Sequence, residues 1–159
     1  MTTFPREEIE ATVAEYHAER ENIRAGKGWW TDLARFFTDD AVYIDPAWGR
    51  VEGLDNIREF FNESMLGLED WTFPITAVGY DANIVLVKWT QIFKNAAGTE
   101  FAQSGLSTMR YAGNGKFDYD EDILNMAHVN EDMRASEWRP AANFTFPPRN
   151  PNRNWSFPA

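Results

Sequence analysis

The 159-residue sequence predicts a protein of the α+β class, in which a cone-like, curved antiparallel sheet is wrapped around three N-terminal helices. Two observations lead to this prediction. Helical patterns come first along the chain, with one short strand among them, and long strands follow. The composition, 43% hydrophobic and 15% aromatic, is also rich enough for one buried core with an aromatic interior.

The three helices are predicted from the spacing of their apolar residues and from their end signals. The first follows Pro5, which suits an opening helical position, and buries a stripe that includes Ile9, Val13 and Tyr16. The second helix is expected over residues 29–37. The third is expected over residues 54–65, close to a glycine that would end it.

A short strand is predicted between the second and third helices. Residues 38–40 are polar and indicate a turn, whereas residues 41–45 are β-rich and end in Asp45. Pro46 ends the ladder because it has no N–H to donate. Tyr43 and Asp45 share a face of this strand, since side chains alternate with period two. A carboxylate at a strand end, beside a loop that contains Trp48, is expected to lie at the mouth of a cavity.

Four further strands are predicted after the helices, over residues 71–78, 84–93, 101–112 and 117–129. The first contains Pro74 and is expected to be an edge or bulged strand. Residues 113–115, with the sequence Gly-Asn-Gly, indicate a hairpin turn between the last two strands. We therefore predict one domain over residues 1–135.

Residues 136–159 form a separate segment of different composition. Five prolines exclude regular structure, but the aromatic residues are unlike those of a disordered tail. We predict an ordered, extended, Pro/aromatic-rich C-terminal arm. It could pack on its own domain, on a dimer mate, or over the cavity as a lid.

Charge and composition exclude several classes of function. The formal net charge of −10 argues against nucleic acid or an anionic membrane surface as a partner. The absence of cysteine excludes disulfides and thiol catalysis. The only two histidines, His17 and His128, have no spacing that calls for a metal, so neither a metal nor another cofactor is predicted. No apolar signal core or membrane-spanning stretch is present, so we expect a cytoplasmic protein.

The stretch from Leu33 to Phe61 resembles the motif of the SnoaL-like, nuclear-transport-factor-2-like superfamily. The matching residues are Leu33-Ala34-Arg35-Phe36-Phe37, Asp45-Pro46, Gly53 and Ile57-Arg58-Glu59-Phe60-Phe61. Ketosteroid isomerase, scytalone dehydratase, limonene-epoxide hydrolase and polyketide cyclases are members. The resemblance covers roughly residues 5–130, and it implies the cone fold and a pocket for a small hydrophobic molecule.

The resemblance also implies roles for individual residues. In ketosteroid isomerases the aspartate of the corresponding Asp-Pro pair is the proton-shuttling base, which falls on Asp45 here. Tyr16 would donate a hydrogen bond into the cavity, as the first-helix tyrosine does there; the alternative is a core tyrosine with a satisfied hydroxyl. Ser107 stands where the isomerase has its protonated, oxyanion-binding aspartate, so that part of the oxyanion hole is absent or replaced.

The remaining pocket residues follow from the faces of the strands. If Ser107 faces the cavity, Gln103 and Met109 face it too. Tyr43, Trp48 and Trp89 complete the expected lining. On the last strand two polar pairs compete for the inner face, Glu121 with Asn125 and Asp122 with His128, and the sequence leaves both open.

Together these features predict a cofactor-independent acid–base enzyme that acts on a small hydrophobic substrate. Isomerase, dehydratase (a lyase), cyclase and epoxide hydrolase are the candidate reactions, because burial can raise the pKa of a carboxylate toward the operating pH. The alternative is a non-catalytic ligand-binding or interaction domain on the same fold. A homodimer is expected, since symmetric dimers are the commonest oligomers.

Overall fold

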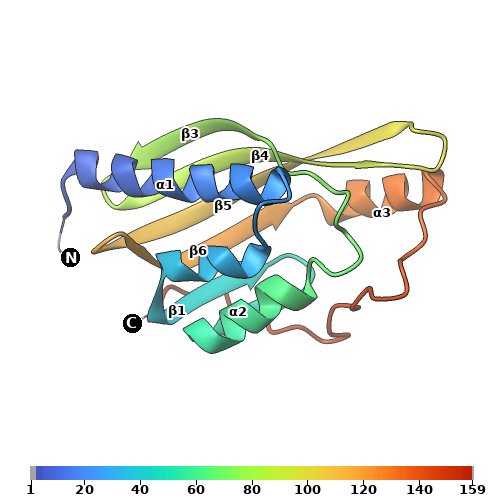
Figure 1. Cartoon of the computed structure of the whole chain (residues 1–159). Helices are drawn as coiled ribbons and strands as arrows, with labels where there is room; N and C mark the ends of the chain where they lie inside the picture. The colour runs from blue at the N-terminus through green and yellow to red at the C-terminus, as the bar shows by residue number, and fades with distance from the viewer. Residues whose placement is uncertain (1–2, 159) are drawn as a thin grey trace.

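The computed structural model, which describes residues 3–158, has one six-stranded sheet with helices on its concave side (Figure 1). In chain order the elements are α1 (Arg6–Arg24), the 3₁₀-helix η1 (Trp30–Phe36), β1 (Phe37–Asp45), β2 (Gly49–Glu52), α2 (Leu54–Glu63), β3 (Ile75–Asp81), β4 (Ile84–Lys94), β5 (Glu100–Gly113), β6 (Lys116–Leu124) and α3 (Met126–Ala135). The predicted α+β class is confirmed. No helix among the described residues is long and apolar enough to cross a membrane.

The sheet has the order β2-β1-β6-β5-β4-β3. The strands from β3 to β6 form an antiparallel meander, and β4 and β5 pair along their whole lengths. One pairing departs from the predicted antiparallel sheet, because β1 and β6 run parallel. The long connection through α2 carries the chain to the far edge of the sheet, so β6 returns beside β1 in the same direction as β1.

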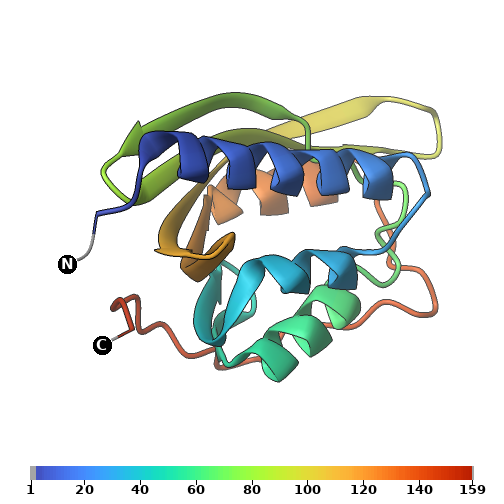
Figure 2. The ribbon, with the colours of Figure 1, turned by 60° about the vertical axis from the view of Figure 1, so that its left-hand side comes forward.

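The core lies between the helices and the concave face of the sheet. Figure 2 shows α1 in front of the upper strands of the curved sheet, with η1 and α2 below α1. Their apolar faces meet the sheet in a cluster that includes Ile9, Leu33, Phe37, Ile57, Tyr111 and Phe117, all at most 1% exposed. The helical stripe predicted through Ile9, Val13 and Tyr16 is therefore buried as expected.

Two predicted segments near β1 have a different structure. The expected second helix is a seven-residue 3₁₀-helix, and Phe37 already belongs to β1. The expected polar turn at residues 38–40 lies inside β1, where the register with β6 is irregular between Phe37 and Val42. Ladder hydrogen bonds such as that from Gly53 N to Ala41 O (2.8 Å) hold this segment as strand despite its polar side chains.

The last predicted strand is too long. It ends at Leu124 and not at residue 129. Residues 126–135, which complete the predicted domain, form α3. The signal was present, because Asn125 is a favoured N-cap residue and its side-chain Oδ1 accepts a hydrogen bond from His128 N (3.3 Å). At the other edge β3 starts only at Ile75, and Thr72 forms an isolated bridge with Ile92.

The C-terminal arm packs on its own chain. It leaves α3, passes α2 and ends on the same side of the molecule as the start of α1 (Figures 1 and 2). Arg50 N donates to Asn152 O (2.8 Å), and Tyr119 OH donates to Trp155 O (2.9 Å). Phe157 packs on the ring of Tyr119, with a centroid separation of 4.4 Å. The arm thereby covers part of the outer face of β1, β2 and β6.

Candidate active site

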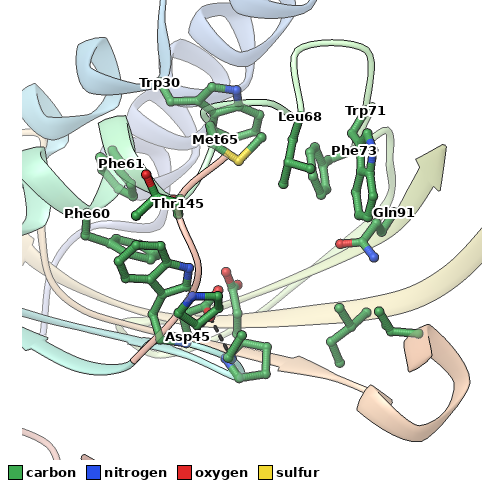
Figure 3. Close-up of a pocket in the computed structure, with 18 of the residues that line it drawn as sticks. Trp30, Asp45, Phe60, Phe61, Met65, Leu68, Trp71, Phe73, Gln91 and Thr145 are labelled. Atoms are coloured by element: carbon green, nitrogen blue, oxygen red, sulfur yellow. Dashed lines mark hydrogen bonds between the residues drawn. The ribbon is translucent and has the colours of Figure 1, made fainter. Parts of the chain in front are cut away.

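A cavity of about 630 Å³ opens between the helices and the concave face of the sheet. Its wall is mostly aromatic and aliphatic, with side chains such as Trp30, Phe60, Phe61, Met65, Leu68 and Phe73 (Figure 3). Residues 138–140 and 144–147 of the arm complete it. The sequence left three positions open for the arm. In the structure the arm both packs on its own domain and covers part of the cavity.

Asp45 lies at the C-terminal end of β1, on the cavity wall. Pro46 ends the strand, and the chain turns so that the next two backbone N–H groups point back at the carboxylate. Asp45 Oδ1 accepts hydrogen bonds from Ala47 N and Trp48 N, both at 2.7 Å. The other oxygen, Oδ2, accepts no hydrogen bond from the described residues, so it is available to a ligand.

Burial raises the pKa of Asp45 to about 6, because the apolar surroundings disfavour the charged form. The hydrogen bonds from Trp48 N and Ala47 N act in the opposite direction, and the nearby carboxylate of Asp122 adds to the rise. A carboxylate with this pKa can both accept and release a proton near neutral pH.

A second carboxylate on the same wall, Asp122 of β6, is held by side chains. Tyr43 OH donates to Asp122 Oδ2 at 2.6 Å, and Ser107 Oγ donates to Oδ1. Ser107 in turn accepts a hydrogen bond from Trp89 Nε1 (2.9 Å). Gly105 makes this chain possible, since a Cβ there would lie 2.4 Å from the indole of Trp89.

The inner end of the site holds Tyr16, Arg20 and Asp120. Asp120 is 1% exposed, and burial raises its pKa well above the usual range of a carboxyl group. Burial also raises the pKa of Tyr16, whose phenol stays protonated and can donate. Arg20 lines the cavity one helical turn after Tyr16 and donates to Phe73 O (3.0 Å).

The structure brings most of the predicted site residues together. Those that line the cavity are Tyr16, Tyr43, Asp45, Trp48, Trp89, Ser107 and Asp122. The two open alternatives on the last strand are thus resolved geometrically, because Asp122 faces the cavity, and Glu121 faces outward and accepts a hydrogen bond from Tyr119 OH (3.0 Å).

Five predicted residues lie outside the cavity lining. Met109 is in the core, and Glu121 is on the outer face. Asn125 caps α3, and His128 lies 3.3 Å from Asp132 on α3, because the strand predicted to carry them inward ends at Leu124. Gln103 lies behind the wall, where it links Gln91 to Asp132.

Several lining residues were not predicted from the sequence. Arg20 follows Tyr16 by four residues, so the helical period that placed Tyr16 on the buried stripe also placed Arg20 near it. Gln91 alternates in phase with Trp89 on β4 and could have been found in the same way. By contrast, nothing local to residues 138–147 shows that they line the cavity. Within residues 3–158 no group of three His, Asp or Glu side chains could hold a metal ion.

Comparison with known proteins agrees with this architecture. A family model described as the SnoaL-like domain matches residues 9–119, and no curated protein sequence matches. A structure named as a SnoaL-like polyketide cyclase from Jannaschia sp. CCS1 is 16% identical and has a TM-score of 0.67, with 88% of this chain and 99% of that chain covered.

Two further similar structures are described by a ligand or a reaction. TerC, co-crystallised with polyporic acid, is 20% identical with a TM-score of 0.57, and the alignment covers 78% of this chain and 95% of that chain. SalBIII, an epoxide hydrolase/cyclase-like enzyme of pyran ring formation in salinomycin, is 22% identical with a TM-score of 0.58, with 77% and 94% covered. At these identities the likeness shows the fold alone.

Proposed function

Since the chain belongs to the SnoaL-like family, we propose that it is a cofactor-independent acid–base enzyme that acts on a small hydrophobic substrate in the cavity. The fold family includes cyclases, isomerases and epoxide hydrolase-like enzymes. The proposed reaction is of this kind, and it begins with proton transfer to or from Asp45.

The observation that carries the proposal is the state of the Asp45 carboxylate. One oxygen is fixed by two backbone N–H groups, and the other is left without a partner among the described residues on the wall of an apolar cavity. A general base needs this combination, because it must be held in position and still have a lone pair within reach of the substrate. The pKa of about 6 supports the same role.

Tyr16 is the proposed partner of Asp45 in the reaction. Its phenol lines the cavity, and burial keeps it protonated, so it can donate a hydrogen bond to a substrate oxygen on which negative charge develops. The positive charge of Arg20, on the same face of α1, would favour the same developing charge. Tyr43, Trp48, Trp89, Ser107 and Asp122 would hold the substrate and orient it.

A ligand of one similar protein and the reaction of another support a hydrophobic, ring-containing ligand. TerC was crystallised with polyporic acid, and SalBIII takes part in pyran ring formation. The aromatic cavity of this chain suits flat ring systems, because aromatic side chains stack against them at little cost in conformational freedom.

The outer face of the sheet is the proposed contact of a homodimer. Leu86 of β4 and Ile123 of β6 are exposed there, at 39% and 55%, next to the aromatic end of the arm. Pairing would remove this apolar surface from water. Light scattering should give twice the chain mass at micromolar concentration, and a monomer mass would contradict this part of the proposal.

The experiment on function compares the wild-type protein with the Asp45→Asn variant on two simple substrates. Deuterium exchange next to the carbonyl of 2-tetralone reports proton abstraction, and hydrolysis of styrene oxide reports epoxide opening. We expect the wild type to accelerate at least one of them, and Asp45→Asn to lower that rate by about 100-fold or more. Wild-type rates in the variant would show that Asp45 only caps its turn. Ligand binding without turnover of either compound would favour the non-catalytic alternative.

A further inference from the structure

A chain of hydrogen bonds runs from the cavity to α3, on a side of the cavity away from Asp45. Gln91 of β4 lines the cavity and is 7% exposed. Its Nε2 donates to Gln103 Oε1 at 2.9 Å, and Gln103 Nε2 donates to Asp132 Oδ2 at 2.6 Å. These hydrogen bonds have no part in the proton transfer proposed above.

Asp132 determines the direction of this chain. An ionised carboxylate only accepts hydrogen bonds, so the amide group of Gln103 must turn its NH₂ toward Asp132. The carbonyl oxygen of Gln103 then faces Gln91, so Gln91 must donate a hydrogen bond to it through its own NH₂ group. His128 Nε2 lies 3.3 Å from the same oxygen of Asp132.

One acceptor is left over at the cavity end of the chain. Because the NH₂ of Gln91 is turned toward Gln103, its carbonyl oxygen points away from that partner, and Figure 3 shows this oxygen directed into the cavity. Among the described residues no donor bonds to it. This oxygen is accessible from the cavity, so a hydroxyl of a bound ligand can donate a hydrogen bond to it.

We propose that the ligand of this cavity carries a hydroxyl group, which donates to the carbonyl oxygen of Gln91 while the reacting part of the ligand lies at Asp45. Figure 3 shows Gln91 and Asp45 on different sides of the cavity. The substrate class is therefore an alcohol or phenol on an apolar, ring-containing frame. The inference rests on the proposed function for two points, that the cavity is the ligand site and that the reacting part lies at Asp45; the hydroxyl contact with Gln91 is tested without turnover.

The test uses two fluorescent probes that differ in the donor alone, 1-hydroxypyrene and 1-methoxypyrene, titrated into the purified full-length chain. We expect the wild type to bind the hydroxyl compound about tenfold more tightly, the value of one hydrogen bond to a group that is otherwise unpaired. Gln91→Leu, of similar size but without an acceptor, should bind both probes with equal affinity. Equal binding by the wild type, failure to bind either probe, or an unchanged preference in Gln91→Leu would overturn the proposal.

Asp132→Asn provides a second variant at a site remote from the cavity wall. Its amide can donate as well as accept, so the chain can reverse and the preference for the hydroxyl should decrease at least threefold. Thr90→Val, on the same strand as Gln91 but on the opposite face, is the matched control and should keep the full preference. An unchanged preference in Asp132→Asn would contradict the role given to the chain of hydrogen bonds.

Asp45→Asn separates this inference from the proposed function. The variant should lose turnover and keep its preference for 1-hydroxypyrene. If it loses the preference and Gln91→Leu keeps it, the hydroxyl binds at Asp45 and the inference fails, whether or not the protein is an enzyme. If the preference follows Gln91 but no variant or wild type shows turnover, the proposed function fails and the hydroxyl site remains.

Discussion

Asp45 and Asp122 are two aspartates on one cavity wall, and they differ in what holds them. Asp45 is held through one oxygen by backbone N–H groups of its own turn. Asp122 is held through both oxygens by the hydroxyls of Tyr43 and Ser107, which come from other strands. The type of residue is the same, but only Asp45 has an oxygen free for a proton. The comparison shows that availability for chemistry depends on the partners of a carboxylate and not on its position at a cavity.

The largest expected difference between the two aspartates is in turnover. Asp45→Asn removes the proton acceptor, so we expect a loss of about 100-fold or more, whereas Asp122→Asn should lower turnover by about tenfold or less. Initial rates of both variants, measured on whichever test substrate the wild type converts, check this. A larger loss in Asp122→Asn than in Asp45→Asn would reverse the roles given to the two residues.

The pH dependence of turnover should follow Asp45. A general base works in its ionised form, and the pKa of Asp45 is about 6. We therefore expect kcat/KM to fall as the pH drops below about 6, by roughly tenfold for each further pH unit. Steady-state rates between pH 4 and 8 measure this. A profile that is flat from pH 5 to 8 would exclude Asp45 as the titrating base.

Ionisation of Asp45 should also lower the stability of the folded chain, although the ionised form is the one that is active. Between pH 3.8 and about 6 the folded chain binds the Asp45 proton more tightly than the unfolded chain, so stability falls as the pH rises through this window. Asn at this position keeps the acceptor for the turn but carries no charge. The free energy of unfolding of Asp45→Asn should therefore exceed that of the wild type by up to roughly 3 kcal/mol at pH 7.

Urea denaturation at pH 7 and at pH 4 measures this difference, which should shrink at the lower pH. A variant that is less stable than the wild type at pH 7 would show that the turn needs the carboxylate itself.

The smallest expected effect is at Asp122. Tyr43→Phe removes one of its two donors, which should raise the pKa of Asp122 further, because the hydrogen bond from Tyr43 lowers it. We expect the free energy of unfolding to fall by about 1 kcal/mol, the usual net value of one hydrogen bond, with turnover reduced less than in Asp45→Asn. Urea denaturation and initial rates check both values. A loss of turnover equal to that of Asp45→Asn would place Tyr43 in the proton transfer.

Much of the candidate site could be predicted from local patterns in the sequence. Asp45 was found because β-rich residues, a carboxylate and a proline follow one another. Tyr43 followed from alternation with Asp45 along the strand, whereas Tyr16 and Ser107 were placed at the site by the family resemblance. The face of β6 could not be chosen, because both faces of that segment carry polar residues. The structure turns Asp120 and Asp122 inward, and the hydroxyls of Tyr43 and Ser107 bond to Asp122.

What the sequence by itself determined is the α+β class, the first helix, the end of β1 and the composition of the arm, because each depends on neighbours within a few residues of one another. Only the tertiary structure decided the parallel pairing of β1 with β6, the path of the arm over the cavity, and the chain from Gln91 through Gln103 to Asp132. These features join residues that are 12 to 107 positions apart, such as Gln91 with Gln103, Tyr43 with Asp122, and Pro46 with Arg153. Local propensity cannot predict such long-range contacts, because they form only when packing brings separate strands and the arm together.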